Sequence, residues 1–539
     1  MGKSPYKKIA KGDMKGWVKE ELIDLLPPNF FQDPVPSVKG IGREIIAESK
    51  WRWAGLFTLP GGESVFLKRD RTKGWLELLK YLVFPSKGRK EWFIAYQLGK
   101  RNLNIPRPMG WMERVHRGWV KESYYLSEAV ESGAPLSEVT HLLEDGRISS
   151  ELVKMIIRMH ASGLLHKDLH AGNFLWDGVS FYLTDLHRAR ILKSLSLNQK
   201  LWNLAHLFHS LRLVWGEEDQ VHFLGEYFMG EHISPEKKRK YLHKIHFWMD
   251  RLQRKQWQSR TKRCLKESTE FSVKKEKGIT IYLRNDLSLD RLKKVIESHL
   301  TFVREKPSDL LKNSPEVKVF LIEDEKGRVY VKQFCYPHFW ERMKDNFRLS
   351  KGLKAWLGGN GLGVRGIASV RPLALVENRD WLGVKESLLL MEALDSSQEM
   401  DRYILKGFKD FNAKMLFIRN FAQWLSSLHQ KRIYHRDMKT CNILVSEKRG
   451  TWNFHLLDLE DILLDEKVNE KKLFKNLLQL NTSTPSLMTR TDRLRFFKAY
   501  QDRHPIIKNE KGFLFRLIRK SRERGIVYVS PHGVVEETF

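Results

Sequence analysis

Two stretches of the sequence decide the fold, HKDLHAGN at residues 166–173 and HRDMKTCN at residues 435–442. Each stretch places an asparagine five residues after an aspartate. Transfer of a phosphoryl group needs a carboxylate that accepts the proton of the attacking hydroxyl. It also needs oxygen ligands for Mg²⁺. An aspartate and an asparagine at this spacing supply both, so the two stretches predict two phosphoryl-transfer sites.

The two stretches belong to a repeat that covers most of the chain. GESVFLKR at 62–69 aligns with KGRVYVKQ at 326–333, and SKGRKEW at 86–92 aligns with SKGLKAW at 350–356 at the same offset. Further blocks match in the same order with little drift: IPRPMGW with SVRPLAL, LSEAVES with LMEALDS, MHASGLLHKDLHAGNFL with LHQKRIYHRDMKTCNIL, and YLTDL with HLLDL. Chance does not keep six blocks in order, so the sequence predicts two copies of one domain.

The predicted boundary between the copies lies in a charge-rich segment, RLQRKQWQSRTKRCLKESTEFSVKKEKG at residues 251–278. Its weak periodicity and its Lys-Gly end favour a basic helix end followed by a linker. We therefore expect a first domain at 1–260, a basic linker at 261–278 and a second domain at 279–539. A basic amphipathic helix here could touch an anionic membrane, but a solvated helix face explains the charges more simply.

Each copy is predicted to have strands followed by helices. Alternating apolar runs at Ser64–Arg69 and Val329–Gln333 predict a strand that carries a lysine, and helices are expected from about residues 87 and 351. A long amphipathic helix follows in each copy. The apolar faces of these helices are Leu152, Met155, Ile156 and Met159 in one copy and Ile418, Phe421, Leu425 and Leu428 in the other. This order predicts a two-lobed α+β domain.

Two further residue types complete each predicted site. Asp185 and Asp458 follow apolar strands and are placed to add a metal-binding carboxylate to the asparagine of each stretch. A cation must also hold the phosphates of the nucleotide. Lys68 and Lys332, at the ends of V-F-L-K and V-Y-V-K, suit that role.

With these residues in place, the chain resembles the protein-kinase-like fold. Within that fold it is similar to the bacterial lipopolysaccharide core kinases, which phosphorylate heptose or Kdo sugars, here in two tandem copies. Further cues are SKGLKAW…VRPLALVE and TRTDRLRFFKAY at 489–500, with FLGEYF at 223–228 as a degenerate counterpart. The resemblance implies an ATP- and Mg-dependent phosphotransferase with an alcohol group as acceptor. It would move the γ-phosphate of ATP to a sugar hydroxyl of the lipopolysaccharide inner core.

The resemblance also implies a role for each candidate residue. The catalytic residues would be Asp168 and Asp437. The residues that bind magnesium would be Asn173, Asp185, Asn442 and Asp458. The residues that bind ATP would be Lys68, Glu91, Glu128, Val130, Lys332, Glu392 and Leu394. Among these, Glu128 and Val130, like Glu392 and Leu394, belong to hinge segments that would present their backbone to adenine.

The second copy departs from the kinase pattern at one position. A kinase holds its strand lysine with a glutamate from a helix, and Glu91 fits that role in the first copy. Its counterpart in the second copy is Ala355. Glu460 and Asp461 lie beside Asp458, and we expect both to face solvent. The second copy is therefore the better candidate for a non-catalytic binding domain.

The loops around the predicted sites give weaker signals. Neither copy has a clean glycine-rich loop, and Lys39-Gly40-Ile41-Gly42 and Lys312-Asn313-Ser314 are the candidates for the turns that cover the phosphates. No A-P-E segment follows the metal aspartates, which favours a small acceptor over a protein.

Four histidines lie near the predicted sites. His160 and His429 end an apolar helix, and we expect them to pack in the core. His166 and His435 begin the two decisive stretches, and we expect them to brace the loops and not to transfer protons.

Composition and charge limit the class of protein. The 539 residues include 42% hydrophobic residues, which excludes a disordered chain. The three cysteines lie far apart, which excludes a disulfide framework. Apolar runs such as Leu78–Phe84 are interrupted by charge and fall short of the roughly 18–20 residues of a membrane span.

The charge also indicates the partners. The chain carries 95 Lys+Arg against 65 Asp+Glu, a net charge of +30. This excess favours an anionic glycolipid or sugar substrate and association with a membrane surface, and no motif that reads nucleic acid is present. We expect a cytoplasmic protein that is peripheral on the inner face of the inner membrane. The oligomeric state is left open, as are two other functions: a kinase for another small-molecule acceptor, and one active copy beside a pseudokinase.

Overall fold

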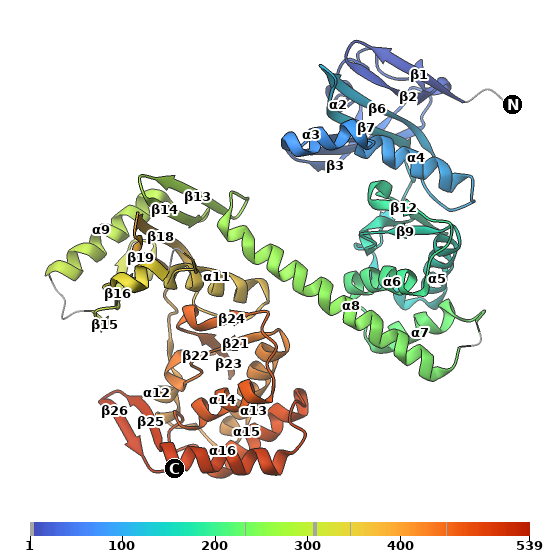
Figure 1. Ribbon diagram of the computed structural model, residues 1–539. Helices are drawn as coiled ribbons and strands as arrows, with labels where there is room; N and C mark the ends of the chain where they lie inside the picture. The colour runs from blue at the N-terminus through green and yellow to red at the C-terminus, as the bar shows by residue number, and fades with distance from the viewer. Residues whose placement is uncertain (1–4, 232, 306–309, 345–346, 449) are drawn as a thin grey trace. The chain divides into compact units, whose positions relative to one another are not determined.

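The chain forms two compact units, Met1–Gln253 and Arg254–Phe539. The computed structural model describes residues 5–231, 233–305, 310–344, 347–448 and 450–539. Each unit has a β-rich lobe followed by a helical lobe, and the two seven-stranded sheets have the same strand order (Figure 1). The predicted α+β fold and the predicted tandem duplication are both confirmed.

The β-rich lobe of the first unit is a seven-stranded antiparallel sheet with the order β1-β2-β6-β7-β5-β4-β3. Lys68 lies in β5, between β4 and β7. Helices α1 and α2 connect β2 to β3, and α3 and α4 connect β5 to β6. The bounds are β1 Tyr6–Lys11, β2 Met14–Lys19, α1 Glu20–Ile23, α2 Pro34–Lys39, β3 Gly42–Glu48, β4 Arg52–Thr58, β5 Ser64–Arg71, α3 Gly74–Val83, α4 Lys87–Gly99, β6 Pro108–His116 and β7 Trp119–Glu128.

The second unit repeats this sheet with the order β13-β14-β18-β19-β17-β16-β15. Lys332 lies in β17, which occupies the place of β5. Helix α9 connects β14 to β15, and α10 and α11 connect β17 to β18. The bounds are β13 Phe271–Glu276, β14 Ile279–Arg284, α9 Leu289–Glu305, β15 Lys312–Asn313, β16 Val317–Asp324, β17 Gly327–Cys335, α10 Phe339–Lys344, α11 Lys351–Val364, β18 Pro372–Asp380 and β19 Gly383–Glu392.

The segment expected to link the copies contains secondary structure. Helix α8, Pro235–Thr261, runs past the boundary at Gln253, and a 3₁₀ turn precedes β13. Strand β13 pairs with β14 from Phe271 to Glu276, as β1 pairs with β2. Its last three residues, KKE, are exposed, which hides the strand pattern in the sequence. Residues 271–276 therefore belong to the second sheet.

The helical lobes follow the same plan. In each, a long helix is followed by two short strand pairs and a helical bundle. In the first unit the elements are β8 Ala134–Pro135, α5 Gly146–Ala161, β9 Leu164–His166, β10 Phe174–Trp176, β11 Phe181–Leu183, β12 Ala189–Ile191, α6 Leu197–Leu211, α7 Glu217–Tyr227 and α8. In the second they are β20 Ser397–Glu399, α12 Met400–Leu405, α13 Phe411–Gln430, β21 Ile433–His435, β22 Ile443–Lys448, β23 Thr451–Leu456, β24 Ile462–Leu464, α14 Glu470–Asn481, α15 Arg490–Arg503, α16 Glu510–Arg524, β25 Ile526–Ser530 and β26 Gly533–Glu537.

The repeated Ser-Lys-Gly sequence explains how α4 and α11 begin. Ser86 and Ser350 cap the two helices, each accepting a hydrogen bond from a backbone N–H three residues on. The glycine lets the helix approach the sheet, because a Cβ on Gly88 would lie 2.4 Å from the carbonyl oxygen of Tyr124. A Cβ on Gly352 would lie 2.4 Å from Oγ of Ser387. This packing sets α4 against β7 and α11 against β19, the strands that pair with the lysine strands β5 and β17.

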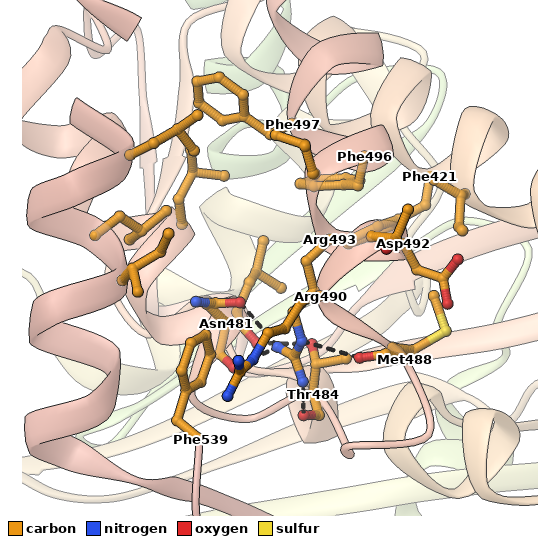
Figure 2. Close-up of a pocket in the computed structure, with 18 of the residues that line it drawn as sticks. Phe421, Asn481, Thr484, Met488, Arg490, Asp492, Arg493, Phe496, Phe497 and Phe539 are labelled. Carbon is orange, nitrogen blue, oxygen red and sulfur yellow. Dashed lines mark hydrogen bonds between the residues drawn. The ribbon is translucent and has the colours of Figure 1, made fainter. Parts of the chain in front are cut away.

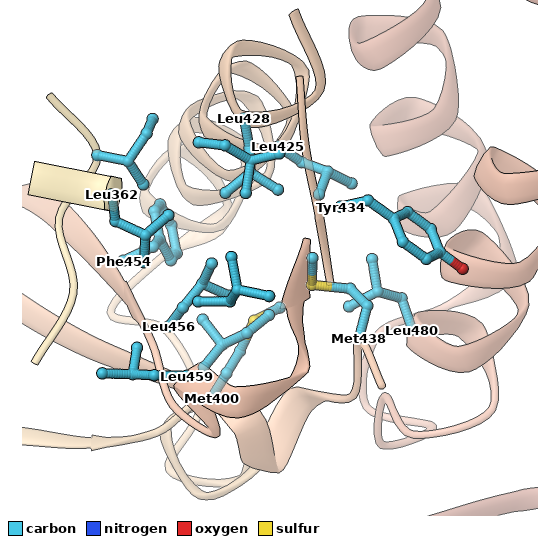
Figure 3. Packing of buried hydrophobic residues seen from close by; sticks show 14 of the residues in the cluster. Leu362, Met400, Leu425, Leu428, Tyr434, Met438, Phe454, Leu456, Leu459 and Leu480 are labelled. Atoms are coloured by element: carbon cyan, nitrogen blue, oxygen red, sulfur yellow. The ribbon is translucent and has the colours of Figure 1, made fainter. Parts of the chain in front are cut away.

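The long helices bury the faces that the sequence predicts. All eight predicted apolar residues of α5 and α13 are buried. In the second unit, Leu425 and Leu428 share one core with Met438, Leu456 and Leu459, which flank the predicted site (Figure 3). This core fixes the loops that carry the site. Among the helices that the structure describes, none is long and apolar enough to cross a bilayer.

Candidate active site

In the first unit, two carboxylates hold the strand lysine. Lys68 Nζ lies 2.9 Å from Oε2 of Glu91, on α4, and 2.5 Å from Oδ1 of Asp185, which follows β11. The side chains of Lys68 and Glu91 are only 6% and 4% exposed. The structure thus brings together three predicted residues that lie far apart in the sequence.

The charges of this cluster stabilise one another. Burial opposes the charged form of Lys68, but Glu91 and Asp185 outweigh it and raise the pKa of the ammonium group. Burial also opposes ionisation of Asp185. Its hydrogen bond with His187 and the charge of Lys68 nevertheless hold the pKa of that carboxyl well below its usual range. Lys68 and Asp185 are therefore both charged at neutral pH.

The backbone at the metal aspartates is strained. Asp185 has a φ of 57° and Asp458 a φ of 45°, in the left-handed region that non-glycine residues seldom adopt. Such strain persists where surrounding contacts fix it, often at functional sites. In the first unit, Lys90 Nζ donates to the carbonyl oxygen of His187 at 2.8 Å, and His187 Nδ1 bonds Asp185 Oδ1 at 2.7 Å.

His166 connects the loop of Asp168 to Asp185. Its Nδ1 accepts a hydrogen bond from the backbone N–H of Asp168 at 3.2 Å, and its Nε2 donates to the carbonyl oxygen of Asp185 at 3.2 Å. Burial lowers the pKa of His166 to about 4, so the ring is neutral at pH 7 and can make both bonds. The expected bracing role is confirmed.

Asp168 and Asn173 lie on the same loop. The side-chain nitrogen of Asn173 donates to the carbonyl oxygen of Asp168 at 2.8 Å, which leaves the amide oxygen of Asn173 as the atom that it offers to a metal. The carboxylate of Asp168 pairs with Arg188 at 2.6 Å. Together with the Asp185 carboxylate, the Asn173 amide gives the oxygen donors that Mg²⁺ prefers. The residues present therefore fit this ion.

The second unit holds its strand lysine with a different pair of carboxylates. Lys332 Nζ lies 2.7 Å from Asp458 Oδ1 and 2.7 Å from Glu460 Oε1. The expectation that Glu460 faces solvent is wrong, because the 3₁₀ turn after Asp458 leaves this side chain only 17% exposed, against the lysine. Ala355, on α11, is fully buried. Glu460 therefore supplies the carboxylate that Glu91 supplies in the first unit.

The electrostatics of this second cluster match those of the first. Burial opposes the charge of Lys332, but Glu460 and Asp458 outweigh it and raise the pKa of the ammonium group. Burial raises the pKa of the Asp458 carboxyl, but the charge of Lys332 lowers it, and the pKa lies below its usual range. The two units thus reach one charge arrangement by different residues.

The loop of Asp437 repeats the first-unit geometry. His435 Nδ1 accepts from the N–H of Asp437 at 3.2 Å, and its Nε2 donates to the carbonyl oxygen of Leu457 at 3.0 Å. Asn442 donates to the carbonyl oxygen of Asp437 at 2.8 Å. The Asp437 carboxylate accepts from Gln479 Nε2 at 3.2 Å. This loop also fits a base and a magnesium ligand.

The predicted hinge residues lie where each β-rich lobe joins its helical lobe. Glu128 ends β7 and Glu392 ends β19, the strands that pair with β5 and β17. Val130 and Leu394 follow two residues later. In the first unit, Arg107 Nε holds Glu128 Oε2 at 2.7 Å. The hinge backbone is thus placed at the junction of the lobes, as expected for an adenine site.

The turns that face the lysine strands differ from those expected. Lys39–Gly42 ends α2 and begins β3, so it does not form the turn between β3 and β4. That turn is residues 49–51, and Arg52 directly after it reaches Asp185 Oδ1 at 3.5 Å. In the second unit, Lys312 and Asn313 of the candidate turn form β15, and only Ser314 lies in the turn before β16. The charge of Lys312 helps to lower the pKa of Asp458.

Arg52 was missed by sequence reasoning. The sequence shows only a cation that directly follows the short turn at 49–51 and lies in the strand before the lysine strand. Without a glycine pattern, nothing distinguishes it from a surface arginine.

His160 and His429 are structural. His160 Nδ1 bonds the hydroxyl of Tyr227 at 2.7 Å, and His429 Nδ1 bonds the hydroxyl of Tyr500 at 2.8 Å. Burial lowers the pKa of each histidine to about 3. The two tyrosines come from FLGEYF and TRTDRLRFFKAY, so these segments occupy equivalent places. The expected packing role is confirmed.

A cavity of about 590 Å³ opens beside Asp437. Lys439 and Arg524 line it together with Gln479 and Tyr528. The hairpin β25–β26 that closes one side is anchored to Asp401, whose carboxylate accepts from the N–H of Val529 at 3.1 Å. Two cations and two carboxylates, Asp401 and Asp437, thus line this cavity, and Lys439 Nζ pairs with Asp437 Oδ2 at 3.1 Å.

A second, apolar cavity of about 380 Å³ lies among α13, α14, α15 and α16 (Figure 2). Arg493 lies at its polar edge and donates to the carbonyl oxygens of Asn481, Thr484, Pro485 and Met488. Burial lowers the pKa of Arg493 to about 10. These backbone carbonyl groups accept the hydrogen bonds of the Arg493 guanidinium. Helix α15, which carries Arg493, therefore braces the loop between α14 and α15.

Comparison with known proteins agrees with the geometry. The model of the "Lipopolysaccharide kinase (Kdo/WaaP) family" matches residues 38–227 and 360–500, one stretch in each unit. A solved structure described as "WaaP in complex with acyl carrier protein" is similar at 18% identity, over 40% of this chain and 88% of that chain, with a TM-score of 0.33. No curated protein matches the chain. Since the family model covers more than half of its residues, the chain belongs to the lipopolysaccharide kinase (Kdo/WaaP) family.

Proposed function

We propose that each unit is an ATP-dependent kinase for a sugar hydroxyl of the lipopolysaccharide inner core. The observation that carries the proposal is the same arrangement in both units. A buried strand lysine is paired with the metal aspartate, and a histidine connects the backbone of that segment to the loop of the candidate base. Family membership supports the reaction class.

The residues of each unit divide the work of phosphoryl transfer. Lys68 and Lys332 hold the phosphates of ATP and are themselves positioned by Glu91 and Glu460. Bound magnesium, held by the aspartate after the last strand and the loop asparagine, neutralises charge on the phosphates. Catalysis then depends mainly on positioning and on charge neutralisation.

Asp168 and Asp437 orient the acceptor hydroxyl and take its proton. The adjacent histidine fixes each through its backbone N–H and not through its carboxylate. Arg188 and Gln479 contact these carboxylates and help to set their direction.

The cavity beside Asp437 is the proposed acceptor site of the second unit. Lys439 and Arg524 line it beside the carboxylates of Asp401 and Asp437, so the cavity offers both cations and acceptors to the hydroxyl and acidic groups of a sugar. Because this lining is balanced in charge, the preference for an anionic sugar over a cationic aminoglycoside-like acceptor rests on family membership. The net charge of +30 also supports work at an anionic membrane face, where such a glycolipid resides.

Transfer of labelled γ-phosphate from ATP to purified core lipopolysaccharide tests the proposal. The assay compares the wild type with the Asp168→Ala/Asp437→Ala double variant, with an aminoglycoside as a control acceptor. We expect transfer to the lipopolysaccharide by the wild type alone. Equal transfer by the double variant, or transfer only to the aminoglycoside, would contradict the proposed function.

A further inference from the structure

Helix α3 lies on the surface of the first β-rich lobe, and none of its residues is buried. Trp75, Leu76, Leu82 and Val83 are 68%, 67%, 59% and 79% exposed. Phe84, directly after the helix, is 59% exposed. An exposed apolar surface of this kind marks a site of interaction.

An aromatic groove adjoins the helix. Tyr81, Trp92, Tyr96 and Trp111 line a cavity of about 640 Å³ together with Arg89. Tryptophan and tyrosine are enriched at membrane–water interfaces, where one end of the ring is apolar and the other is hydrated. The groove therefore has the composition of an interfacial surface.

Cations outnumber carboxylates along α3 and the residues that flank it. The only carboxylate in residues 71–90 is Glu77, which Lys87 Nζ neutralises at 3.0 Å, and Arg71 pairs with Glu122 at 2.8 Å. The remaining cations of the stretch are Lys73, Lys80, Arg89 and Lys90, and Glu113 also lines the groove. Basic residues beside an exposed apolar helix complement an anionic lipid surface. A protein partner with an apolar face would not require this excess of positive charge.

The second unit has the same feature at the same place in the fold. In the chain, helix α10 lies between β17 and α11, as α3 lies between β5 and α4. Phe339 and Trp340 in this helix are 50% and 71% exposed, and Phe347 after it is 91% exposed. Two copies with different sequences thus keep exposed aromatic side chains at one position, which favours a shared role over chance.

We propose that α3 docks the first unit onto an anionic bilayer by inserting its apolar side chains into the interface. The helix has 10 residues, too few to span a membrane, so it lies in the interfacial plane. It is adjacent in the chain to the strand of Lys68 and to the helix of Glu91. The inference deepens the proposed function, because a kinase held there would meet a glycolipid acceptor at the membrane.

Flotation of the full chain with lipid vesicles tests the docking without ATP or lipopolysaccharide. One set of vesicles contains phosphatidylglycerol and phosphatidylethanolamine, and the other contains only phosphatidylcholine. We expect the wild type to float with the anionic vesicles and the Leu76→Glu/Val83→Glu variant to partition at least about tenfold less. Val179→Glu, at a residue 78% exposed in the same unit, is the matched control and should float like the wild type.

Three results would overturn the inference. The first is that the wild type does not float with either set of vesicles. The second is that the double variant floats as well as the wild type. The third is that the wild type forms a dimer and binds no vesicles, while the double variant is a monomer. Circular dichroism and transfer to a delipidated core oligosaccharide verify that the double variant is folded. If the wild type floats but transfers phosphate to neither acceptor, the proposed function fails while the docking inference stands.

Discussion

Removal of Glu460 should damage the second site as removal of Glu91 damages the first. Lys332 makes two ion pairs of 2.7 Å, and only Asp458 would remain to hold it. A hydrogen bond to a charged group contributes about 1.5–3 kcal/mol, and about 1.4 kcal/mol corresponds to a factor of ten. We therefore expect Glu460→Ala to lower kcat/KM for ATP by about 10- to 100-fold.

The two sites can be assayed one at a time. An Asp168→Ala background reports the second site, and an Asp437→Ala background reports the first. Glu91→Ala should show a loss of the same size in the first site. Asp461→Ala is the matched control, because this neighbouring carboxylate pairs with Arg436 and not with Lys332, and its effect should stay within about twofold.

A transplant tests the reasoning further. Adding Ala355→Glu to Glu460→Ala places the carboxylate where the first unit has it, and we expect partial recovery of kcat/KM. The reasoning is refuted if Glu460→Ala alone stays within about twofold of its parent, as the control does.

Three other variants test separate parts of the account. Arg52→Ala removes a cation 3.5 Å from Asp185 and should raise KM for ATP of the first site about three- to tenfold with kcat little changed, in steady-state kinetics. Arg493→Met removes the hydrogen-bond donor of four partly buried carbonyl groups. It should lower the free energy of unfolding of the second unit by about 3 kcal/mol in urea titrations, and an unchanged midpoint would contradict this. Burial lowers the pKa of His429 to about 3, below the value of about 6.5 in the unfolded chain. Protonation of this histidine therefore favours the unfolded chain below about pH 6.5 and should lower the free energy of unfolding by about 2 kcal/mol at pH 5. His429→Asn should flatten that dependence in melts at pH 7 and pH 5.

The sequence predicted the parts of the site that depend on local spacing. Asp168 and Asn173 are five residues apart on one loop, Lys68 lies in a strand of recognisable pattern, and Asp185 follows another. The succession of strands and helices along the chain and the buried faces of α5 and α13 follow from apolar periodicity, which burial enforces. These features recur in both units, so each copy supported the interpretation of the other.

Features that depend on the direction of a side chain were not predictable. The sequence places Glu460 beside Asp458, but the left-handed backbone at Asp458 and the turn after it decide that Glu460 reaches Lys332. Strand β13 was hidden because its outer residues are charged, and its pairing with β14 completes a sheet whose other strands are distant in sequence. Only the structure shows that Glu460 pairs with Lys332 in place of a glutamate at position 355.

The most direct test of the account is the position of each phosphate on the product. Core lipopolysaccharide would be treated with ATP and wild type, Asp168→Ala or Asp437→Ala, and analysed by fragment mass spectrometry. Two working sites predict phosphate at two positions with the wild type and at one, different position with each variant. If one variant matches the wild type and the other transfers nothing, only one unit is a kinase and the claim of two active sites is contradicted.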